Sequence, residues 1–269
     1  MHQLVFFDGY IVPAANTIGV SALSSAALYG KGVFTTIAVT DGEPFLWDKH
    51  WSRIETNAVK LGIDISAQGE DETKRALELL IAQNRILNGR TRISFFDGSS
   101  SSVWPSEASG ETHLLIMTGD QRSVHENSRL TVSPFTVNSR SPLARIKSCN
   151  YLENLLAFDE SNKRGFDEAV RVNERGHIAS GCMTNIFWLS GGQLHTPSLA
   201  TGCLAGTTRE FVLENIECDE VEAGIEVLEE ADAIFLTSAG LGVVQAKEFQ
   251  TKQLNRTDHP ILHLLPKRI

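Results

Sequence analysis

A single lysine, Lys147, lies at the junction of a strand-like run and an apolar helix in residues 144–158, which read ARIKSCNYLENLLAF. Tyr151 follows one helical turn later, and the helical pattern continues to Gly165, a residue suited to a left-handed helix end. A lysine beside a hydrophobic wall can lose hydration, which lowers the pKa of its amine and makes it a nucleophile. Because most lysines are merely solvated, this segment alone leaves both roles open.

The sequence outside this segment predicts a mixed α+β fold. Short runs of β-branched and aromatic residues flank Asp8-Gly9 and Asp41-Gly42, and both patterns are typical of β-hairpins. Apolar residues recur at helical spacing in residues 48–63, and a second helix is predicted for residues 71–84. Strands and helices therefore do not alternate strictly, which favours the α+β class.

A change in composition divides the predicted fold into two domains. Polar residues dominate residues 119–128, which we interpret as a linker. The N-terminal α+β domain would then span residues 1–118, and a C-terminal α/β domain would span residues 129–269. The C-terminal domain would carry Lys147 and a further helix at residues 207–216.

Composition and charge exclude several classes of partner. The 269 residues are 42% hydrophobic, enough to bury one large core or two modest ones. The net charge of −9 and the scattered basic residues argue against nucleic acid or an anionic membrane. No apolar stretch approaches the ~20 residues of a spanning helix, and the first residues lack a secretion signal, so we expect a cytoplasmic protein. Four cysteines and eight histidines show no ligand-like spacing, so we expect reduced thiols and no metal site.

Two segments of small residues have the composition of phosphate-binding loops. Gly206-Thr207-Thr208 comes directly before a helix, where backbone amides, the helix dipole and two hydroxyls could bind an anion. A simple threonine cap would satisfy the same amides without a ligand. Residues 237–240, TSAG, end a buried-looking strand and form either the other half of a phosphate cup or an ordinary loop. Gly30-Lys31-Gly32 lacks the spacing of a phosphate loop and is predicted only to shape a turn.

The order of these segments resembles that of the class IV, fold-type IV pyridoxal-phosphate enzymes. This family includes branched-chain and D-amino-acid aminotransferases and 4-amino-4-deoxychorismate lyase. Residues 29–54, YGKGVFTTIAVTDGEPFLWDKHWSRI, resemble the family's YGDGVFETI segment and its H-x-x-R motif. Residues 147–188 resemble the lysine helix with the following strand pair, and residues 196–210 and 229–244 resemble the phosphate loop and the final strand. The resemblance implies two α/β domains with the cofactor between them, and a homodimer.

The resemblance also implies roles for residues around the cofactor, pyridoxal 5'-phosphate. Lys147 would form the internal aldimine and then move the Cα proton as general acid and base. Arg53, in the motif His50-x-x-Arg53, would bind the cofactor phosphate, which a fixed guanidinium suits better than an ammonium. Tyr151 would lie near the phenolic oxygen, and Leu204 would pack on the pyridine ring. The remaining phosphate contacts would come from Thr207, Thr208, Ser238 and Ala239.

One departure from the family concerns the electronics of the ring. The family segment Gly-Tyr-Val-Thr-Glu-Gly reads GHIASG in residues 176–181, so Ser180 replaces the glutamate that pairs with the pyridine nitrogen. A nearby carboxylate shifts a pKa by about 1–3 units and would keep that nitrogen protonated, which makes the ring a strong electron sink. A serine hydroxyl can hydrogen-bond the nitrogen but supplies no charge. We interpret the neighbouring His177 as a structural strand residue rather than a substitute acid.

Other departures concern the substrate. The family's Phe-Glu-Thr is Phe34-Thr35-Thr36 here, which is closer to the lyase, whereas Asn150-Tyr151 is closer to the aminotransferases. Where many relatives have Arg-Gly, this chain has Asp97-Gly98, which removes an expected clamp for the substrate α-carboxylate. Arg92 is the candidate to replace that clamp, and Tyr29 would border the substrate pocket.

Three functions follow from the resemblance. The first is an amino-acid aminotransferase with ping-pong kinetics, acting on branched-chain or other apolar substrates and their keto acids. The second is 4-amino-4-deoxychorismate lyase, which releases pyruvate and 4-aminobenzoate without a keto-acid acceptor. The third is a relative that binds pyridoxal phosphate with altered or lost activity, since Ser180 replaces the usual glutamate.

Overall fold

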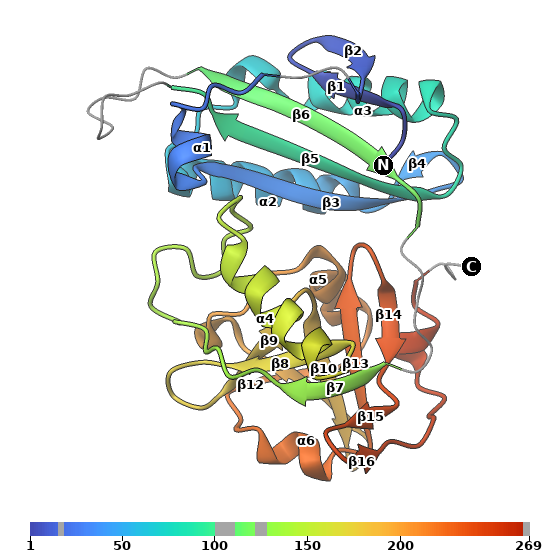
Figure 1. The fold of residues 1–269 in the computed structure, drawn as a ribbon. Coiled ribbons are helices and arrows are strands. Elements are labelled where there is room, and N and C mark those ends of the chain that lie inside the picture. Colours follow the sequence, from blue (N-terminus) through green and yellow to red (C-terminus); the bar gives the residue numbers. More distant parts are fainter. Residues whose placement is uncertain (16–18, 100–110, 122–127, 266–269) are drawn as a thin grey trace. The chain divides into compact units, whose positions relative to one another are not determined.

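The computed structural model describes residues 1–15, 19–99, 111–121 and 128–265 and divides into two compact units (Figure 1). The first unit comprises Met1–Arg122 with Lys147–Asn150, and the second comprises Ser123–Ile146 with Tyr151–Ile269. Both units combine strands with helices, which confirms the α+β prediction. No helix in the described ranges is long and apolar enough to cross a membrane.

The first unit is built on a six-stranded sheet in the order β2-β1-β6-β5-β3-β4, with every neighbouring pair antiparallel. Its strands are β1 (Leu4–Phe7), β2 (Tyr10–Pro13), β3 (Gly32–Thr40), β4 (Glu43–Pro44), β5 (Gly89–Asp97) and β6 (Thr112–Gly119). Its helices are α1 (Ser25–Tyr29), α2 (Trp47–Leu61), α3 (Glu70–Gln83) and a 3-10 turn at Ser66–Gln68. The predicted helices at residues 48–63 and 71–84 are thus confirmed within two residues as α2 and α3.

Both predicted hairpins are present in this unit. Asp8 and Gly9 join β1 to β2, and Asp41 and Gly42 join β3 to β4. All four residues have positive φ angles, between 44° and 92°, as two-residue turns between antiparallel strands require. The sequence predicted these turns because Asp-Gly tolerates that backbone conformation.

Alternation along the strands gives the first sheet two different faces. One face packs with α2 and α3 into a single hydrophobic core that includes Ile37, Ile93 and Ile116. Successive side chains of a strand point to opposite faces, so Phe34 and Arg92 lie on the face turned away from this core. The second face of the sheet is therefore available for the polar residues of a site.

The second unit contains two five-stranded sheets, ordered β12-β11-β10-β13-β14 and β16-β15-β7-β8-β9. The first sheet has β10 (Asn185–Ser190), β11 (Gln193–Pro197), β12 (Asp219–Val221), β13 (Ala233–Ser238) and β14 (Gly242–Gln245). The second has β7 (Arg129–Val132), β8 (Glu168–Val172), β9 (Ile178–Gly181), β15 (Glu248–Phe249) and β16 (Lys252–Gln253). The helices are α4 (Leu152–Lys163), α5 (Thr207–Asn215), α6 (Glu226–Glu230) and 3-10 turns at Leu199–Thr201 and Pro260–Leu262.

The division into units differs from the predicted domains at the lysine. Residues 122–127 of the predicted linker lie outside the described residues. The prediction placed Lys147 in the C-terminal domain, whereas the structure groups Lys147–Asn150 with the first unit. The reason is long-range pairing, because the backbone of these residues hydrogen-bonds to β3. Local sequence patterns carry no information about such a pairing.

Candidate functional site

The backbone of Lys147 is fixed by the edge of β3. The Phe34 amide donates to the Lys147 carbonyl at 3.0 Å, and the Cys149 amide donates to the Gly32 carbonyl at 2.8 Å. Ser148 pairs with Val33 between these two bonds. Since side chains alternate, Lys147 points to the same face as Phe34, and its Nζ lies 4.4 Å from the centre of the Phe34 ring.

The environment of Lys147 favours a neutral amine. Burial, together with the positive charges of Arg53 and Arg92, lowers the pKa of Lys147 to about 7. The Cys149 side chain acts in the opposite direction but is the smallest of these influences. An amine with this pKa is a competent nucleophile and base near neutral pH, as the sequence analysis anticipated.

Arg53, on α2, is oriented by hydrogen bonds that run through Thr35 of β3 and back to His50 of the same helix. Its Nη2 donates to Thr35 Oγ1 at 2.8 Å, and the same oxygen lies 2.6 Å from His50 Nδ1. His50 and Thr35 are both buried, and Arg53 is partly buried. Arg53 and His50 come from one face of α2, as the spacing His50-x-x-Arg53 requires. The orienting role of Thr35 was missed, because nothing in the sequence links β3 to that face of α2.

Arg92 lies on the same face of the sheet as the lysine. Its guanidinium carbon stacks 3.6 Å above the centre of the Phe34 ring, and its Nε donates to Ser94 Oγ at 3.1 Å. Phe34 thus contacts two basic side chains of this face, Lys147 and Arg92. Tyr29, the other predicted substrate residue, ends α1 in the same unit and is 39% exposed.

In the second unit, the N-terminus of α5 has the form of an anion site. The residue at the N-cap is Gly206, which makes no side-chain cap, so the alternative of a threonine cap is wrong. Thr207 and Thr208 begin the helix and are both buried. A helix start without a side-chain cap directs backbone amides and the positive end of the helix dipole outward.

Asn185 positions this helix start, although the sequence did not single it out. Its Nδ2 donates to the Leu204 carbonyl at 2.8 Å. A Cβ at Gly206 would overlap Asn185 Oδ1, so any other residue there would require the Asn185 side chain to shift. Asn185 also pairs with Thr237 across β10 and β13. This pairing links the predicted loop around Leu204 to the strand end that leads to Ser238.

The hydroxyl of Thr237 is buried and has no hydrogen-bond partner among the described residues. Next along the chain, Ser238 and Ala239 are partly buried, and the Ser238 hydroxyl accepts from the Leu241 amide at 3.1 Å. A buried hydroxyl without a partner is uncommon in a folded protein and is consistent with a polar ligand at this strand end.

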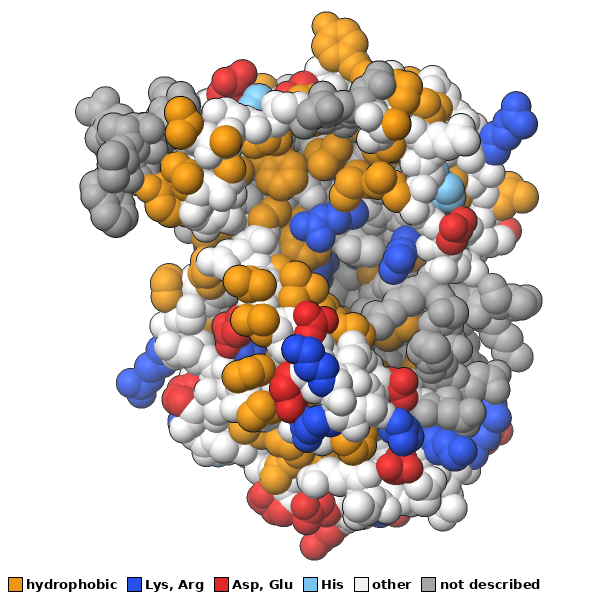
Figure 2. Space-filling view, in the orientation of Figure 1, with side chains coloured by type: hydrophobic (Ala, Val, Ile, Leu, Met, Phe, Trp, Pro, Cys, Tyr) orange, Lys and Arg blue, Asp and Glu red, His pale blue; other side chains and the backbone are white. Residues whose placement is uncertain are grey.

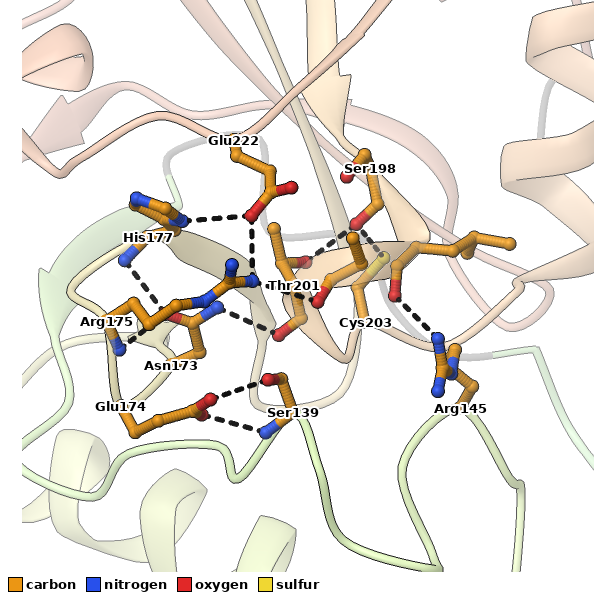
Figure 3. A network of polar contacts seen from close by, with 12 residues as sticks. Ser139, Arg145, Asn173, Glu174, Arg175, His177, Ser198, Thr201, Cys203 and Glu222 are labelled. Atoms are coloured by element: carbon orange, nitrogen blue, oxygen red, sulfur yellow. Dashed lines mark hydrogen bonds and ion pairs between the residues drawn. The ribbon is translucent and has the colours of Figure 1, made fainter.

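A polar network supports the loop that leads to Leu204 (Figure 3). Asn173, in the turn between β8 and β9, donates to the Thr201 carbonyl at 3.3 Å. In the same turn Arg175 and His177 both bind Glu222, at 2.7 and 3.2 Å. His177 is therefore engaged with Glu222, as expected of a structural residue.

Ser180 lies in β9 directly opposite Arg171 of β8. Arg171 is buried, donates to the Thr136 carbonyl at 3.0 Å and forms an ion pair with Glu153 of α4. Opposite residues of an antiparallel pair place their side chains on the same face. The hydroxyl of Ser180 thus has a cation as its cross-strand neighbour.

Comparison with known proteins shows the family to which the chain belongs. The sequence profile of the family described as amino-transferase class IV matches residues 32–249. The chain belongs to this family. The profile match includes Lys147, Arg53, Ser180 and both small-residue segments. The predicted residues Arg92, Tyr151 and Leu204 also lie within the matched range, whereas Tyr29 lies just before it.

Relatives of this class IV aminotransferase family member include enzymes of two reaction types. An aminodeoxychorismate lyase of Bacillus subtilis is 28% identical, with 90% of this chain and 85% of the relative covered. A branched-chain-amino-acid aminotransferase of Pseudomonas aeruginosa is 24% identical, with 93% and 86% covered. A branched-chain amino acid aminotransferase of T.th., solved with pyridoxamine 5'-phosphate, superposes with a TM-score of 0.88 at 22% identity, covering 98% and 92% of the two chains. This last likeness shows a shared fold.

Proposed function

We propose that this class IV family member is a pyridoxal-phosphate-dependent amino-acid aminotransferase of the branched-chain type. The observation that carries the proposal is Lys147, a buried lysine with a pKa of about 7 beside Arg53 and Arg92. A neutral lysine amine next to cationic groups is the form that condenses with a carbonyl group. The cofactor is pyridoxal 5'-phosphate, which carries both a carbonyl group and a phosphate.

The residues of the chain fit this cofactor. Lys147 offers the amine, and the start of α5 at Gly206 offers the positive end of the helix dipole for a phosphate. The buried Thr237 hydroxyl lacks a partner among the described residues. Arg53 is oriented by Thr35 and has the planar set of donors that a phosphate dianion accepts. The residues proposed to hold the phosphate are Arg53, Thr207, Thr208, Ser238 and Ala239.

Each remaining residue has a defined task. Pyridoxal phosphate, when bound, supplies an electron-accepting ring that stabilises negative charge on the substrate Cα. The neutral amine of Lys147 would take the proton from the substrate Cα and, in transamination, would deliver that proton to the former carbonyl carbon of the cofactor. Leu204 would pack against the ring, and Tyr151 would hydrogen-bond its phenolic oxygen. Ser180 would hydrogen-bond the ring nitrogen without charging it.

Arg92 would bind the carboxylate of the amino acid or keto acid. Its guanidinium is held over Phe34 at 3.6 Å, on the sheet face that also carries Lys147. A guanidinium fixed in this way loses little entropy when it binds a carboxylate. Tyr29, at the end of α1, would border the same pocket.

A lyase is the second candidate function, and Thr35 is the observation that favours it. Thr35 stands where the aminotransferases have glutamate, and here it orients Arg53. In this reaction the same lysine would release pyruvate and 4-aminobenzoate from 4-amino-4-deoxychorismate.

Two assays on the purified protein separate these functions. With a branched-chain amino acid and 2-oxoglutarate, a transaminase forms glutamate, and the cofactor absorbance changes when the amino donor is added alone. With 4-amino-4-deoxychorismate, a lyase forms pyruvate without any keto acid. We expect glutamate formation. Pyruvate without glutamate would establish the lyase instead, and cofactor binding with neither product would establish a binding protein of altered activity.

A homodimer is also proposed, and the surface of α4 supports it. Leu152, Leu155 and Leu156 follow one another at helical spacing on α4 and are 62%, 46% and 51% exposed. Figure 2 shows hydrophobic side chains gathered over this helix. Contiguous apolar surface of this kind is commonly covered by another subunit. Sedimentation equilibrium should give twice the mass of the chain, and a monomer would contradict the proposal.

A further inference from the structure

Lys31 and Asp97 form an ion pair at the junction of β3 and β5. Lys31 Nζ lies 2.5 Å from Asp97 Oδ2, and the Asp97 amide donates to the Lys31 carbonyl at 3.1 Å. The Asp97 side chain is 8% exposed, and the Lys31 side chain is 32% exposed.

The other carboxylate oxygen of Asp97 connects this ion pair to α1 through Ser99. Asp97 Oδ1 accepts from the Ser99 amide at 2.9 Å and from the Ser99 hydroxyl. The Ser99 carbonyl accepts from the Ser25 amide at 3.1 Å, and the Ser25 carbonyl accepts from the Lys31 amide at 3.3 Å. Burial acts to raise the pKa of Asp97, but hydrogen bonds from Lys31 and Ser99 outweigh it and lower that pKa. Asp97 is therefore a carboxylate at neutral pH.

Residues 147–150, which include Lys147, pack against the turn that contains Lys31. At Gly30 an added Cβ would lie 3.2 Å from the Cα of Asn150, and the φ angle there is 68°. At Gly32 it would lie 3.0 Å from the sulfur of Cys149 and 2.9 Å from the Phe95 carbonyl oxygen. The Gly32 carbonyl accepts the Cys149 amide. Both neighbours of Lys31 are thus packed against residues 147–150.

We propose that the Lys31–Asp97 ion pair positions Lys147, by fixing the turn against which Lys147–Asn150 is packed. Lys31 and Asp97 are positioning residues and do not touch the reacting atoms. The ion pair joins the start of β3 to the end of β5, and the start of β3 carries the lysine backbone. A shift of this turn moves the lysine amine relative to Arg53 and Arg92. The cofactor side of this inference rests on the proposed function.

Three variants test the proposal. Lys31→Met keeps the length of the side chain but removes its charge, Lys31→Arg keeps the charge, and Asp97→Asn removes the partner's charge. Asp120→Asn is the control, because it removes an exposed ion pair with His2 in the same unit. For each protein, the rate at which added pyridoxal phosphate forms its lysine-bound absorbance band is measured from pH 5 to 10, and a thermal melt reports folding.

We expect Lys31→Met and Asp97→Asn to slow band formation about tenfold, since small misplacements of a reacting group are costly. In both variants the pH midpoint should rise from about 7, because the amine moves away from its buried, cationic surroundings. Lys31→Arg and Asp120→Asn should match the parent protein. A purely electrostatic influence would move the midpoints of Lys31→Met and Asp97→Asn in opposite directions, which would overturn the proposal.

Two other results separate this inference from the proposed function. If the parent protein forms no band with pyridoxal phosphate, the proposed function fails. If the parent forms the band and Lys31→Met matches Lys31→Arg in both rate and midpoint, the positioning role alone fails. Loss of folding in Lys31→Met would also contradict the proposal, since the ion pair would then maintain the whole unit rather than the lysine.

Discussion

The amine of Lys147 differs from that of an ordinary lysine by its surroundings alone. A solvated lysine has a pKa near 10.4, so that at pH 7 only about one molecule in a few thousand carries a neutral amine. Burial and the neighbouring Arg53 and Arg92 bring the pKa of Lys147 to about 7, and about half of the amines are then neutral. The sequence singled out Lys147, Arg53 and Arg92 as candidate site residues. The effect of the two arginines on the pKa of the lysine could not be predicted, because it depends on how β5 and α2 are placed beside Lys147 in the fold.

The pH dependence of Lys147 reactivity follows from this pKa. The protonated amine does not attack a carbonyl group, so the rate of reaction with pyridoxal should rise with pH up to about 7 and then level off. A lysine in a short unstructured peptide should keep rising in reactivity to about pH 10. The measurement is residue-specific labelling followed by mass spectrometry at each pH, with such a peptide added as the reference. A Lys147 profile parallel to that of the reference peptide would contradict the assigned environment.

Arg53 has two separable effects, one on the lysine and one on the phosphate. Replacing it in Arg53→Met removes a positive charge, so the pKa of Lys147 should rise by about one unit. The same change should weaken binding of pyridoxal phosphate much more than binding of pyridoxal, which lacks the phosphate. Arg90→Met is the matched control, because Arg90 is an exposed arginine of β5. Equal losses of affinity for both ligands would show that Arg53 does not bind the phosphate.

At the scale of the elements, the start of α5 depends on a contact that the sequence does not reveal. The motif at Gly206 predicted a phosphate loop or a threonine cap, and the structure has the glycine at the N-cap with Asn185 against it. Asn185 begins β10, and in the sequence it is only a polar residue before an apolar run. Helix periodicity is local, whereas the contact between Asn185 and Gly206 depends on the folded chain.

A methyl group at Gly206 should therefore disturb the phosphate site. In Gly206→Ala the new Cβ would overlap Asn185 Oδ1, and such overpacking costs about 1–3 kcal/mol of unfolding free energy. Affinity for pyridoxal phosphate should fall more than affinity for pyridoxal. Gly19→Ala is the control, because no atom lies within 4 Å of the added Cβ. Unchanged stability and affinity in Gly206→Ala would contradict the observed packing.

The elements that could be predicted are those with a strong local pattern. The helices α2, α3, α4 and α5 and the two Asp-Gly hairpins follow from hydrophobic spacing and turn chemistry. Helix α1 was not predicted, because its five residues are too short to show a helical period and its start depends on the Ser24 cap. The pairing of Ser148 with Val33 joins residues more than a hundred positions apart and leaves no local trace.

At the scale of the whole molecule, two separate segments of the chain form the first unit. Met1–Arg122 forms most of that unit, and Lys147–Asn150 returns to it after an intervening part of the second unit. The proposed catalytic lysine thus depends on strands from the start of the chain for its place. Composition and motif order predicted the α+β class, whereas the assignment of the lysine to one unit required the structure.

Hydrogen exchange should show that the backbone of Lys147–Asn150 is bonded to β3 of the first unit. The Cys149 amide bonds to the Gly32 carbonyl, so it should exchange slowly, together with the amides of β3. Exchange measured by NMR or by fragmentation mass spectrometry resolves this amide. Exchange as fast as in an unstructured peptide would mean that Lys147–Asn150 does not belong to the first unit.

The central claim is that Lys147 binds pyridoxal phosphate, and chemical trapping tests it most directly. The purified protein is incubated with the cofactor, reduced with borohydride, digested and analysed by mass spectrometry, with Lys147→Ala in parallel. We expect a phosphopyridoxyl group on the peptide containing Lys147 and none in the variant. A parent protein without the adduct, or with the same adduct spread over exposed lysines and unchanged in Lys147→Ala, would contradict the account.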